Sequence, residues 1–224
     1  MNTGIRVALT SVWGVASWIL ILMVPAGTLH YWQGWVFIAV FTTATIAPTV
    51  YLARHNPVAL QRRMRAGPRA EPRKAQKFII TGSFLGLFVI MVFSAVDHRF
   101  HWSHVPAWLS VVGDILVATG LGIAMLVIVQ NNYAAATVQV EQGQTVISSG
   151  LYGIVRHPMY VGNVVMMTGI PLALGSYWGL LFVLPGVAVL VARILDEEKL
   201  LFAQLAGYTE YGRRVRYRLV PHVW

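Results

Sequence analysis

The chain has 224 residues, of which 57% are hydrophobic and only 11% are charged. Soluble domains are about 25% charged, so this chain has too few charged residues to cover a soluble fold. The formal net charge is +9, but the basic residues stand in blocks beside apolar runs, which argues against nucleic acid as a partner. The lack of cysteine excludes disulfides, thiolate nucleophiles and cysteine-bound metals.

Six apolar segments follow one another, each close to the length of about 20 residues that crosses a bilayer. They cover residues 7–26, 35–53, 78–96, 106–129, 159–177 and 179–194. The last two are short, contain glycine and proline, and are joined almost directly, so we interpret them as a tight helical hairpin. The sequence therefore predicts an all-α protein, a polytopic transmembrane helical bundle of about six spans.

The positions of the charged residues predict an orientation for these spans. With the amino terminus in the cytoplasm, 16 of the 17 Lys and Arg residues flank the cytoplasmic ends of the spans, and only Arg99 lies outside. This asymmetry follows the positive-inside rule and places both termini in the cytoplasm. No cleavable signal is evident, because the first apolar run is long enough to span and no basic cluster precedes it. We expect a multi-pass protein of the cell (inner) membrane.

We expect one integral-membrane domain over residues 1–224, because no internal repeat or linker divides the chain. Residues 1–130 hold four spans and a basic loop, 54–77. Within that loop, residues 57–64 are predicted to form a short amphipathic helix that orients the chain and contacts lipid headgroups. Residues 131–224 hold a polar segment, the hairpin and a cytoplasmic tail.

The stretch SGLYGIVRHPMYVGN, residues 149–163, contains the first candidate site. Pro158 suits the first turn of a helix, so the fifth span is predicted to begin there. Arg156 and His157 then stand at a helix amino terminus, where backbone N–H groups and the helix dipole favour an anion. The guanidinium adds a fork that matches a carboxylate. The alternative is that both residues only anchor the helix end at the membrane interface.

Three acids, Asp196, Glu197 and Glu198, follow the sixth span directly. A carboxylate here can hold an ammonium group, a ribose hydroxyl or a nearby arginine. The alternative is a structural ion pair, for which Arg193 and Glu197 have the i,i+4 spacing. Gly207 is predicted to end this helix.

Tyrosines and arginines alternate in the tail. They can stack on a base and bind phosphate, or they can form an interfacial belt; they are Tyr208, Tyr211, Tyr217 and the arginines 213, 214, 216 and 218.

Two other polar features lie outside this candidate site. Asp114 is the main ionisable residue within the spans, which argues against an ion pathway. The histidines 98, 101 and 104 fall on the opposite membrane face, so no metal site is expected there.

In order and spacing, RHPMYVG, a hydrophobic hairpin, EEKLL, GYTEYGRRV and a final VP resemble the isoprenylcysteine carboxyl methyltransferase and phospholipid methyltransferase superfamily. The upstream VQVEQGQTVISSGLYGIV and the loop NPVALQRRMR are also similar to that family. The detailed resemblance covers residues 134–221. It implies a cytoplasmic S-adenosylmethionine pocket formed by the C-terminal third of the chain.

The resemblance also implies the residues of that pocket. The expected cofactor-binding residues are Gly150, Tyr152, Arg156, His157, Pro158, Tyr160, Gly162, Glu197, Glu198, Tyr208 and Tyr211. Arg156 and Glu198 are the expected catalytic residues: the arginine neutralises a carboxylate of substrate or cofactor, and the glutamate takes the cofactor's ammonium. Gly120-Leu121-Gly122 matches a Gly-x-Gly of phospholipid methyltransferases, although in an apolar helix this pattern more often serves packing.

The expected reaction is methyl transfer to a lipid or other lipophilic acceptor that enters from the bilayer. Such a transfer needs positioning and a water-poor site, and neither a metal nor a covalent nucleophile. An isoprenylcysteine-type carboxylate is the favoured acceptor, and a phospholipid amine or a small thiol is the alternative. Membrane sterol reductases, which bind NADPH, have a related motif, but with asparagine and an acid where this chain has Met159 and Asn163. A non-enzymatic membrane protein is the remaining alternative.

Overall fold

The computed structural model describes residues 3–64, 67–134 and 137–224, and every regular element in these ranges is helical. The elements are α1 (Thr3–Ala26), α2 (Trp32–His55), α3 (Pro57–Met64), α4 (Lys74–Phe100), α5 (Ala107–Gln130), η1 (Gly150–Gly153), α6 (Pro158–Ala173), η2 (Trp178–Phe182), α7 (Val183–Gln204) and α8 (Tyr208–Arg214). The predicted all-α class is confirmed. So are the start of the fifth apolar helix at Pro158 and the short helix Pro57–Met64.

Four described helical stretches are long and apolar enough to cross a membrane: α2, α4, α5 and the continuous η2–α7 stretch. The apolar part of α1, Trp13–Ala26, and the 16-residue α6 are shorter. Large apolar side chains such as Trp13, Phe78 and Leu184 are exposed on the outside of these helices, as expected for contact with lipid. The total of six spans stays a prediction.

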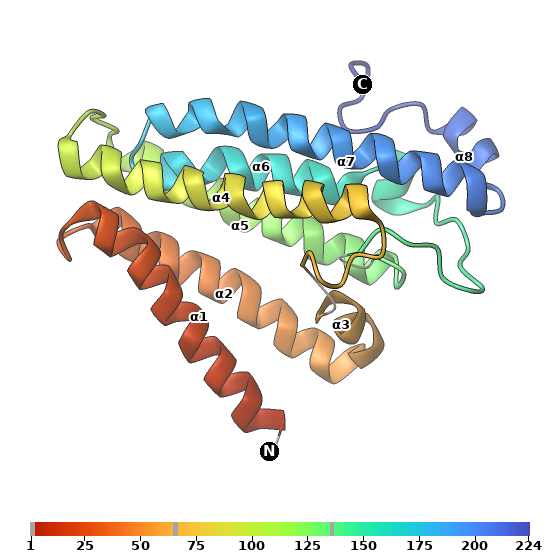
Figure 1. The fold of residues 1–224 in the computed structure, drawn as a ribbon, viewed down its shortest axis with the longest axis horizontal. Helices are drawn as coiled ribbons and strands as arrows, with labels where there is room; N and C mark the ends of the chain where they lie inside the picture. The colour runs from red at the N-terminus through yellow and green to blue at the C-terminus, as the bar shows by residue number, and fades with distance from the viewer. Residues whose placement is uncertain (1–2, 65–66, 135–136) are drawn as a thin grey trace.

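Figure 1 shows α4, α5, α6 and α7 lying side by side, while α1 and α2 meet them at one end and diverge towards the other. The α3 end of the bundle is where α3, the start of α6, the end of α7 and α8 lie. The opposite end, named here the Asp97 end, holds the turns after α1, α4 and α6. All residues of the Arg-His-Pro motif and the three acids therefore lie at the α3 end.

Helices α5 and α6 pack with their backbones in close contact through glycines. A Cβ atom at Gly120 of α5 would overlap the carbonyl oxygen of Gly162 and lie 2.7 Å from the backbone nitrogen of Met166. Gly113 and Gly169 make the equivalent contact two turns away. By contrast, a Cβ at Gly122 would meet nothing within 4 Å. Gly120 therefore serves packing, and this contact fixes the start of α6 against the end of α5.

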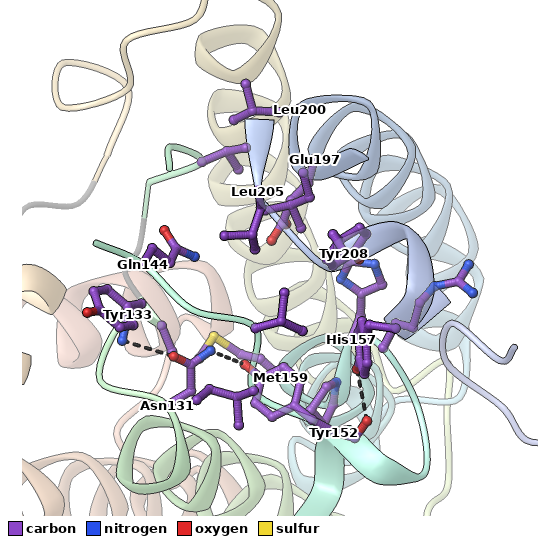
Figure 2. Close-up of a pocket in the computed structure, with 18 of the residues that line it drawn as sticks. Asn131, Tyr133, Gln144, Tyr152, His157, Met159, Glu197, Leu200, Leu205 and Tyr208 are labelled. Atoms are coloured by element: carbon purple, nitrogen blue, oxygen red, sulfur yellow. Dashed lines mark hydrogen bonds between the residues drawn. The ribbon is translucent and has the colours of Figure 1, made fainter. Parts of the chain in front are cut away.

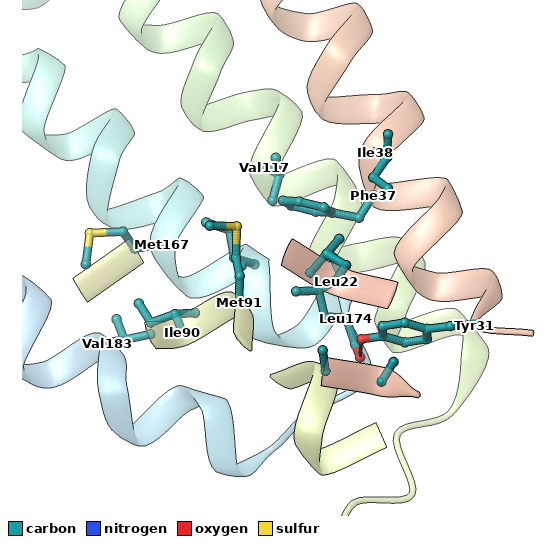
Figure 3. Close-up of a cluster of buried hydrophobic side chains, with 14 of the residues drawn as sticks. Leu22, Tyr31, Phe37, Ile38, Ile90, Met91, Val117, Met167, Leu174 and Val183 are labelled. Atoms are coloured by element: carbon teal, nitrogen blue, oxygen red, sulfur yellow. Dashed lines mark hydrogen bonds between the residues drawn. The ribbon is translucent and has the colours of Figure 1, made fainter. Parts of the chain in front are cut away.

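The main hydrophobic core joins α1, α2, α4, α5, α6 and α7. Figure 3 shows Phe37 of α2 beside Val117 of α5, with Leu22 of α1 close by. The hydroxyl of Tyr31 donates a hydrogen bond of 2.6 Å to the carbonyl oxygen of Leu174, which ties the α1–α2 turn to the end of α6. The core is therefore continuous across helices that are far apart in the chain.

A buried carboxylate holds the turns together at the Asp97 end. Asp97 accepts hydrogen bonds from the backbone nitrogen of Ser103 at 2.8 Å, from its hydroxyl at 2.7 Å, and from the hydroxyl of Ser176. The neighbouring His98 stacks on Tyr31 with ring centroids 4.0 Å apart. These contacts give the hairpin of α6 and α7 its fixed turn, remote from the Arg-His-Pro motif.

Helix α7 continues well beyond the predicted end of the sixth span. It runs to Gln204 and carries Asp196, Glu197 and Glu198 on its final turns. The predicted stop at Gly207 was wrong: α7 ends at Gln204 with Leu205 as its cap, and Gly207, with φ of 80°, caps the start of α8 instead. The acids are thus held on a rigid helix, on which neighbouring residues point about 100° apart.

The two glycines of the Gly-x-Gly pair should respond oppositely to alanine. Gly120→Ala forces the backbones of α5 and α6 apart, and we expect a loss of about 1–3 kcal/mol, seen as a clearly lower apparent Tm in mild detergent. Gly122→Ala adds a methyl group in open space and removes a helix-weakening glycine, so its Tm should be unchanged or higher. Equal losses for both variants would contradict the packing role of Gly120.

Candidate functional site

A pocket lies at the α3 end, between the start of α6, the end of α7 and the chain that follows α5. In Figure 2, Glu197 and Leu200 of α7, with Leu205 just after it, face Asn131, Tyr133 and Gln144, and Met159 lies near the centre. The polar lining residues include Asn131, Tyr133, Gln144, Tyr152, Arg156, His157, Tyr160, Glu197, Tyr208 and Tyr211; the apolar ones include Val138, Val146, Met159, Leu200, Leu201 and Leu205. The lining suits a ligand with both polar and apolar parts.

The structure brings most of the predicted site residues to this pocket. Those that line it are Tyr152, Arg156, His157, Pro158, Tyr160, Glu197, Tyr208 and Tyr211. Gly162 instead packs against α5, and Gly150 makes a turn with φ of 58° over the side chain of Gln130. Glu198 lies behind the lining and not in it. In the tail, Arg213, Arg214 and Arg216 are exposed, and the hydroxyl of Tyr217 is 3.1 Å from Nδ1 of His222.

Glu198 is the centre of a buried ionic cluster. Its side chain is almost fully enclosed, with the residue only 3% exposed. Oε1 accepts hydrogen bonds from Nε of Arg156 at 2.7 Å and lies 3.2 Å from Nε2 of His157. Oε2 accepts from Nε of Arg218 at 2.8 Å. A carboxylate in this setting is held as an anion by its cationic neighbours.

The same cluster fastens the tail to α6. Nη1 of Arg156 donates to the carbonyl oxygens of Val215 and Arg216, both at 3.0 Å. The backbone nitrogens of Arg156 and His157 donate to the carbonyls of Tyr217 and Arg218, at 2.9 and 3.0 Å. The tail therefore runs along the start of α6 as a backbone-paired segment. Glu198, on α7, completes a three-way junction of α6, α7 and the tail.

Glu197 has a different environment from Glu198 and faces the pocket. Its Oε2 accepts a short hydrogen bond of 2.6 Å from the hydroxyl of Tyr160. That hydroxyl in turn accepts from Nε of Arg193 at 2.9 Å. Tyr160 thus contacts both Glu197 and Arg193, the two residues whose i,i+4 spacing suggested an ion pair. This chain of bonds orients one carboxylate towards the pocket.

Two residues of the basic loop belong to this arrangement, although no sequence motif singled them out. Glu71 is 2% exposed; its Oε1 lies 3.2 Å from Nη2 of Arg193, and its Oε2 accepts from the backbone nitrogen of Val138 at 3.2 Å. Gln76, fully buried, accepts from Nη1 of Arg193 at 3.2 Å. The sequence does contain a signal for Glu71: loop 54–77 holds eight Lys and Arg residues, and Glu71 is its only acid.

The same loop has a second attachment to α7. Asp196, the first of the three acids, accepts from Nε2 of Gln76 at 2.5 Å and from Nη2 of Arg73 at 2.8 Å. The three acids therefore differ in what they contact, because Asp196 binds the loop, Glu197 faces the pocket and Glu198 holds the tail. The basic loop is therefore fastened to α7 next to the site, as well as forming a basic surface.

Tyrosines form one side of the pocket. The hydroxyl of Tyr211 donates to the carbonyl of Tyr152 at 2.8 Å, and the ring centroids of Tyr208 and Tyr211 are 5.5 Å apart. Burial raises the pKa of Tyr152 to about 12 and raises the pKa values of Tyr208 and Tyr211 well above their ordinary range, so all three stay neutral. The hydroxyl of Tyr208 is buried and has no hydrogen-bond partner among the described residues. A buried hydroxyl without a partner is uncommon in folded proteins.

Comparisons with known proteins found similarity to a family model, to a sequence relative and to a solved structure. The family model for phospholipid methyltransferases matches residues 108–205. A Delta(14)-sterol reductase of Mus musculus is 34% identical over 91 residues, which are 39% of this chain and 22% of the reductase, so the chain spans about a fifth of that relative. The structure of the eukaryotic intramembrane Ras methyltransferase, an isoprenylcysteine carboxyl methyltransferase, aligns over 100% of this chain and 88% of its own, with 15% identity and a TM-score of 0.48.

The family match runs from the start of α5 through the Arg-His-Pro motif to the end of α7. It therefore contains both helices of the glycine contact, the hairpin and the three acids. Over these residues the chain is similar to the phospholipid methyltransferase family.

Proposed function

We propose that this protein transfers a methyl group from S-adenosylmethionine to a lipophilic acceptor, with an isoprenylcysteine-type carboxylate as the favoured acceptor. The observation that carries the proposal is the pocket at the α3 end. There, Glu197 and Tyr208 line a space together with the residues of the Arg-His-Pro motif. The matched family region encloses the same helices.

The residues of the pocket fit the parts of this cofactor. The carboxylate of Glu197, held by Tyr160, suits its ammonium group. The rings of Tyr152, Tyr208 and Tyr211 offer flat apolar faces for an adenine or a sulfonium cation. S-adenosylmethionine supplies a methyl group already activated for displacement, so the protein's contribution is to position the reactants and exclude water.

Arg156 and Glu198 act in this proposal chiefly by shaping the site. Glu198 already accepts hydrogen bonds from two arginines and lies next to His157, which makes Glu197 the better partner for the cofactor's ammonium. Arg156 lines the pocket while it fastens the tail, so it stays the candidate that neutralises a carboxylate of cofactor or substrate. Of the expected catalytic pair, Arg156 remains our candidate for contact with the reactants, and Glu198 is a positioning residue that acts through Arg156.

The basic segments at the α3 end support an orientation of the protein in the membrane. The basic loop and the arginine-rich tail both lie at the α3 end, which supports placing that end and both termini in the cytoplasm, in the cell (inner) membrane. The polar cofactor then reaches the pocket from water, while the apolar acceptor arrives from the bilayer. A phospholipid amine is the alternative acceptor, for which an acidic or aromatic pocket would be needed.

An NADPH-dependent reductase is the second candidate function, and the identity with a sterol reductase over 91 residues favours it. The two candidates differ in cofactor, so direct binding separates them. Purified protein in mild detergent is titrated with S-adenosylhomocysteine and, separately, with NADPH. We expect saturable binding of the first alone; binding of NADPH alone would replace the methyltransferase proposal, and binding of neither by folded protein would favour a non-enzymatic role.

The variant Glu197→Gln tests which acid faces the cofactor. It keeps the shape of the side chain but removes the charge, so S-adenosylhomocysteine should bind about tenfold to hundredfold more weakly. Glu210→Gln, which neutralises an exposed glutamate on α8, is the matched control and should bind as the wild type does. Unchanged affinity in Glu197→Gln would show that this carboxylate does not contact the ligand.

Loss of the Glu198 charge should release the tail. Glu198→Gln leaves a buried group of cations without its anion, a change that typically costs about 3–5 kcal/mol. We expect a lower apparent Tm than for Glu197→Gln and faster cleavage by trypsin within residues 213–218. Limited proteolysis followed by mass spectrometry measures this directly. A tail as resistant as that of the wild type would contradict the junction of α6, α7 and the tail.

Glu71 should affect ligand binding from a distance, because it touches both Arg193 and the pocket segment at Val138. We expect Glu71→Gln to raise the Kd for S-adenosylhomocysteine several-fold, with a partial rescue in Glu71→Asp. Arg73→Met is the control: it removes another link between loop and α7, but one that is partly exposed and worth little. If Arg73→Met weakened binding as much as Glu71→Gln, a general loosening of the loop would be the cause.

A further inference from the structure

One wall of the pocket has no regular secondary structure. Residues 137–148, all of which the structure describes, contain neither helix nor strand, and a turn lies at Gln142 and Gly143. Seven of these residues line the pocket, among them Val138, Gln144 and Val146. Much of the remaining lining comes from α6, α7 and α8. Because a helix holds its backbone by internal hydrogen bonds, the irregular wall is the one that yields most easily.

The pocket is small when this wall is in place. Its cavity volume is about 110 Å³, whereas pockets for small-molecule ligands enclose roughly 300–1,000 Å³. A ligand of the size of S-adenosylmethionine therefore needs one wall to move outwards. Movement of residues 137–148 unwinds no helix, and the backbone hydrogen bond from Gln144 to the carbonyl of Glu141 lies inside the turn and can move with it.

Both ends of this wall are fastened to the body of the protein. The backbone nitrogen of Val138, the one buried residue of the segment, donates to Oε2 of Glu71 at 3.2 Å. Beyond the other end, the backbone nitrogen of Leu151 donates to Oε1 of Gln130 at 3.1 Å. Residues 139–147, between these two points, are named here the strap. They are half-buried or exposed, so little fully buried surface is uncovered when the strap moves.

One side chain of α3 holds the tip of the strap. Nη2 of Arg62 lies 2.8 Å from Oε2 of Glu141. The same guanidinium lies over the ring of Tyr133, 5.0 Å from its centroid, and the hydroxyl of Tyr133 donates to the carbonyl of Gly143 at 3.2 Å. Arg62 therefore holds the strap twice, directly at Glu141 and through Tyr133 at Gly143.

Helix α3 is a fixed support for this contact. Asn56 caps it: Oδ1 accepts from the backbone nitrogen of Ala59 at 3.1 Å, while the amide donates to Asn132 at 2.7 Å. Ala59 is only 2% exposed and packs with Leu52 of α2 and Ile128 of α5. The arginine at the tip of the strap is thus carried by a helix that is packed against the bundle.

The attachment at the tip is weak enough to open and close. The side chains of Arg62 and Glu141 are 25% and 27% exposed, so water and salt screen their attraction. Val140 and Val146 of the strap pack against the apolar cluster around α8, but both are only half-buried. The ion pairs of Glu198, by contrast, are enclosed. The strap is therefore easier to displace than the walls that the helices form.

We propose that the strap, residues 139–147, opens to admit the ligand of the pocket, and that Arg62 of α3 is the latch that keeps it closed. Because the latch includes a partly exposed ion pair, access to the pocket increases with ionic strength. The short helix of the basic loop thereby acts in ligand exchange as well as beside the membrane. That the admitted ligand is S-adenosylmethionine rests on the proposed function, but the movement of the strap does not.

The absence of cysteine from the chain allows access to be measured without any ligand. A single cysteine is introduced as Leu200→Cys, on the α7 side of the pocket, and its alkylation by N-ethylmaleimide is timed in mild detergent. This parent is combined with Arg62→Met, with Glu141→Gln and with both. The control is Arg54→Met, an exposed arginine of the same basic loop. A separate variant, Thr209→Cys on α8, gives the rate for an exposed thiol.

We expect Arg62→Met and Glu141→Gln each to speed alkylation of the pocket cysteine about two- to fivefold, the range for a partly exposed ion pair. The double variant should match Arg62→Met, because both changes break the same contact. Salt at about 1 M should speed the reaction in the parent but not in Arg62→Met. Arg54→Met should leave the rate unchanged, and Thr209→Cys should react equally fast with and without Arg62.

The kinetics of S-adenosylhomocysteine binding test the same movement in a second way. In Glu141→Gln, association and dissociation should both be faster, with a smaller change in Kd, because an open strap eases entry and exit alike. A pocket that is only loosened would release the ligand faster without admitting it faster. A short bis-maleimide that bridges Arg62→Cys and Glu141→Cys should slow both association and dissociation.

The proposal is overturned if alkylation of the pocket cysteine is equally fast with and without Arg62, or if the bridged protein exchanges S-adenosylhomocysteine as fast as the unbridged one. Faster release without faster entry would also overturn it and leave Arg62 as a structural support. If S-adenosylhomocysteine does not bind but Arg62→Met still speeds alkylation, the strap stands and the methyltransferase proposal falls. The two ideas can therefore fail separately.

Discussion

The buried carboxylate of Glu198 is the interaction on which the site end of the molecule depends. A charge removed from water is tolerated only when other groups replace its hydration, and here Arg156, Arg218 and His157 do so. Because those partners come from the start of α6 and from the tail, one anion on α7 determines where three segments meet. The pocket lining between them follows from that meeting point, to which two of its own members, Arg156 and His157, belong.

The glycine contact between α5 and α6 is the second constraint. Close approach of the two backbones at Gly120 and Gly162 brings Asn131, just after α5, near to Tyr152, just before α6; the amide of Asn131 donates to the Tyr152 hydroxyl at 3.0 Å. The Asp97 cluster fixes the same helices at the other end. The site thus lies at the α3 end of two helices that are fixed to each other along their length and held again at the opposite end.

The local pattern of the sequence was enough to predict most of the helices. Apolar runs predict the long helices, Pro158 predicts where α6 begins, and the charge pattern predicts α3. What local pattern does not contain is the pairing of distant residues: Glu71 with Arg193, or Asp97 with Ser176. Local pattern also leaves open whether Glu197 or Glu198 faces the pocket. The answer depends on how α7 is rotated about its axis, and packing against other helices determines that rotation. Motif resemblance found both glutamates of the pair but not their separate surroundings.

The pairing of the tail with α6 has a consequence for biosynthesis. Helices α1 to α7 leave the ribosome before residues 215–218, and those residues supply the carbonyl groups that satisfy Arg156 and the start of α6. Arg156, which is buried in the folded protein, therefore stays hydrated during membrane insertion until the tail emerges and folds back. The junction of α6, α7 and the tail can therefore form only after residues 215–218 have been made.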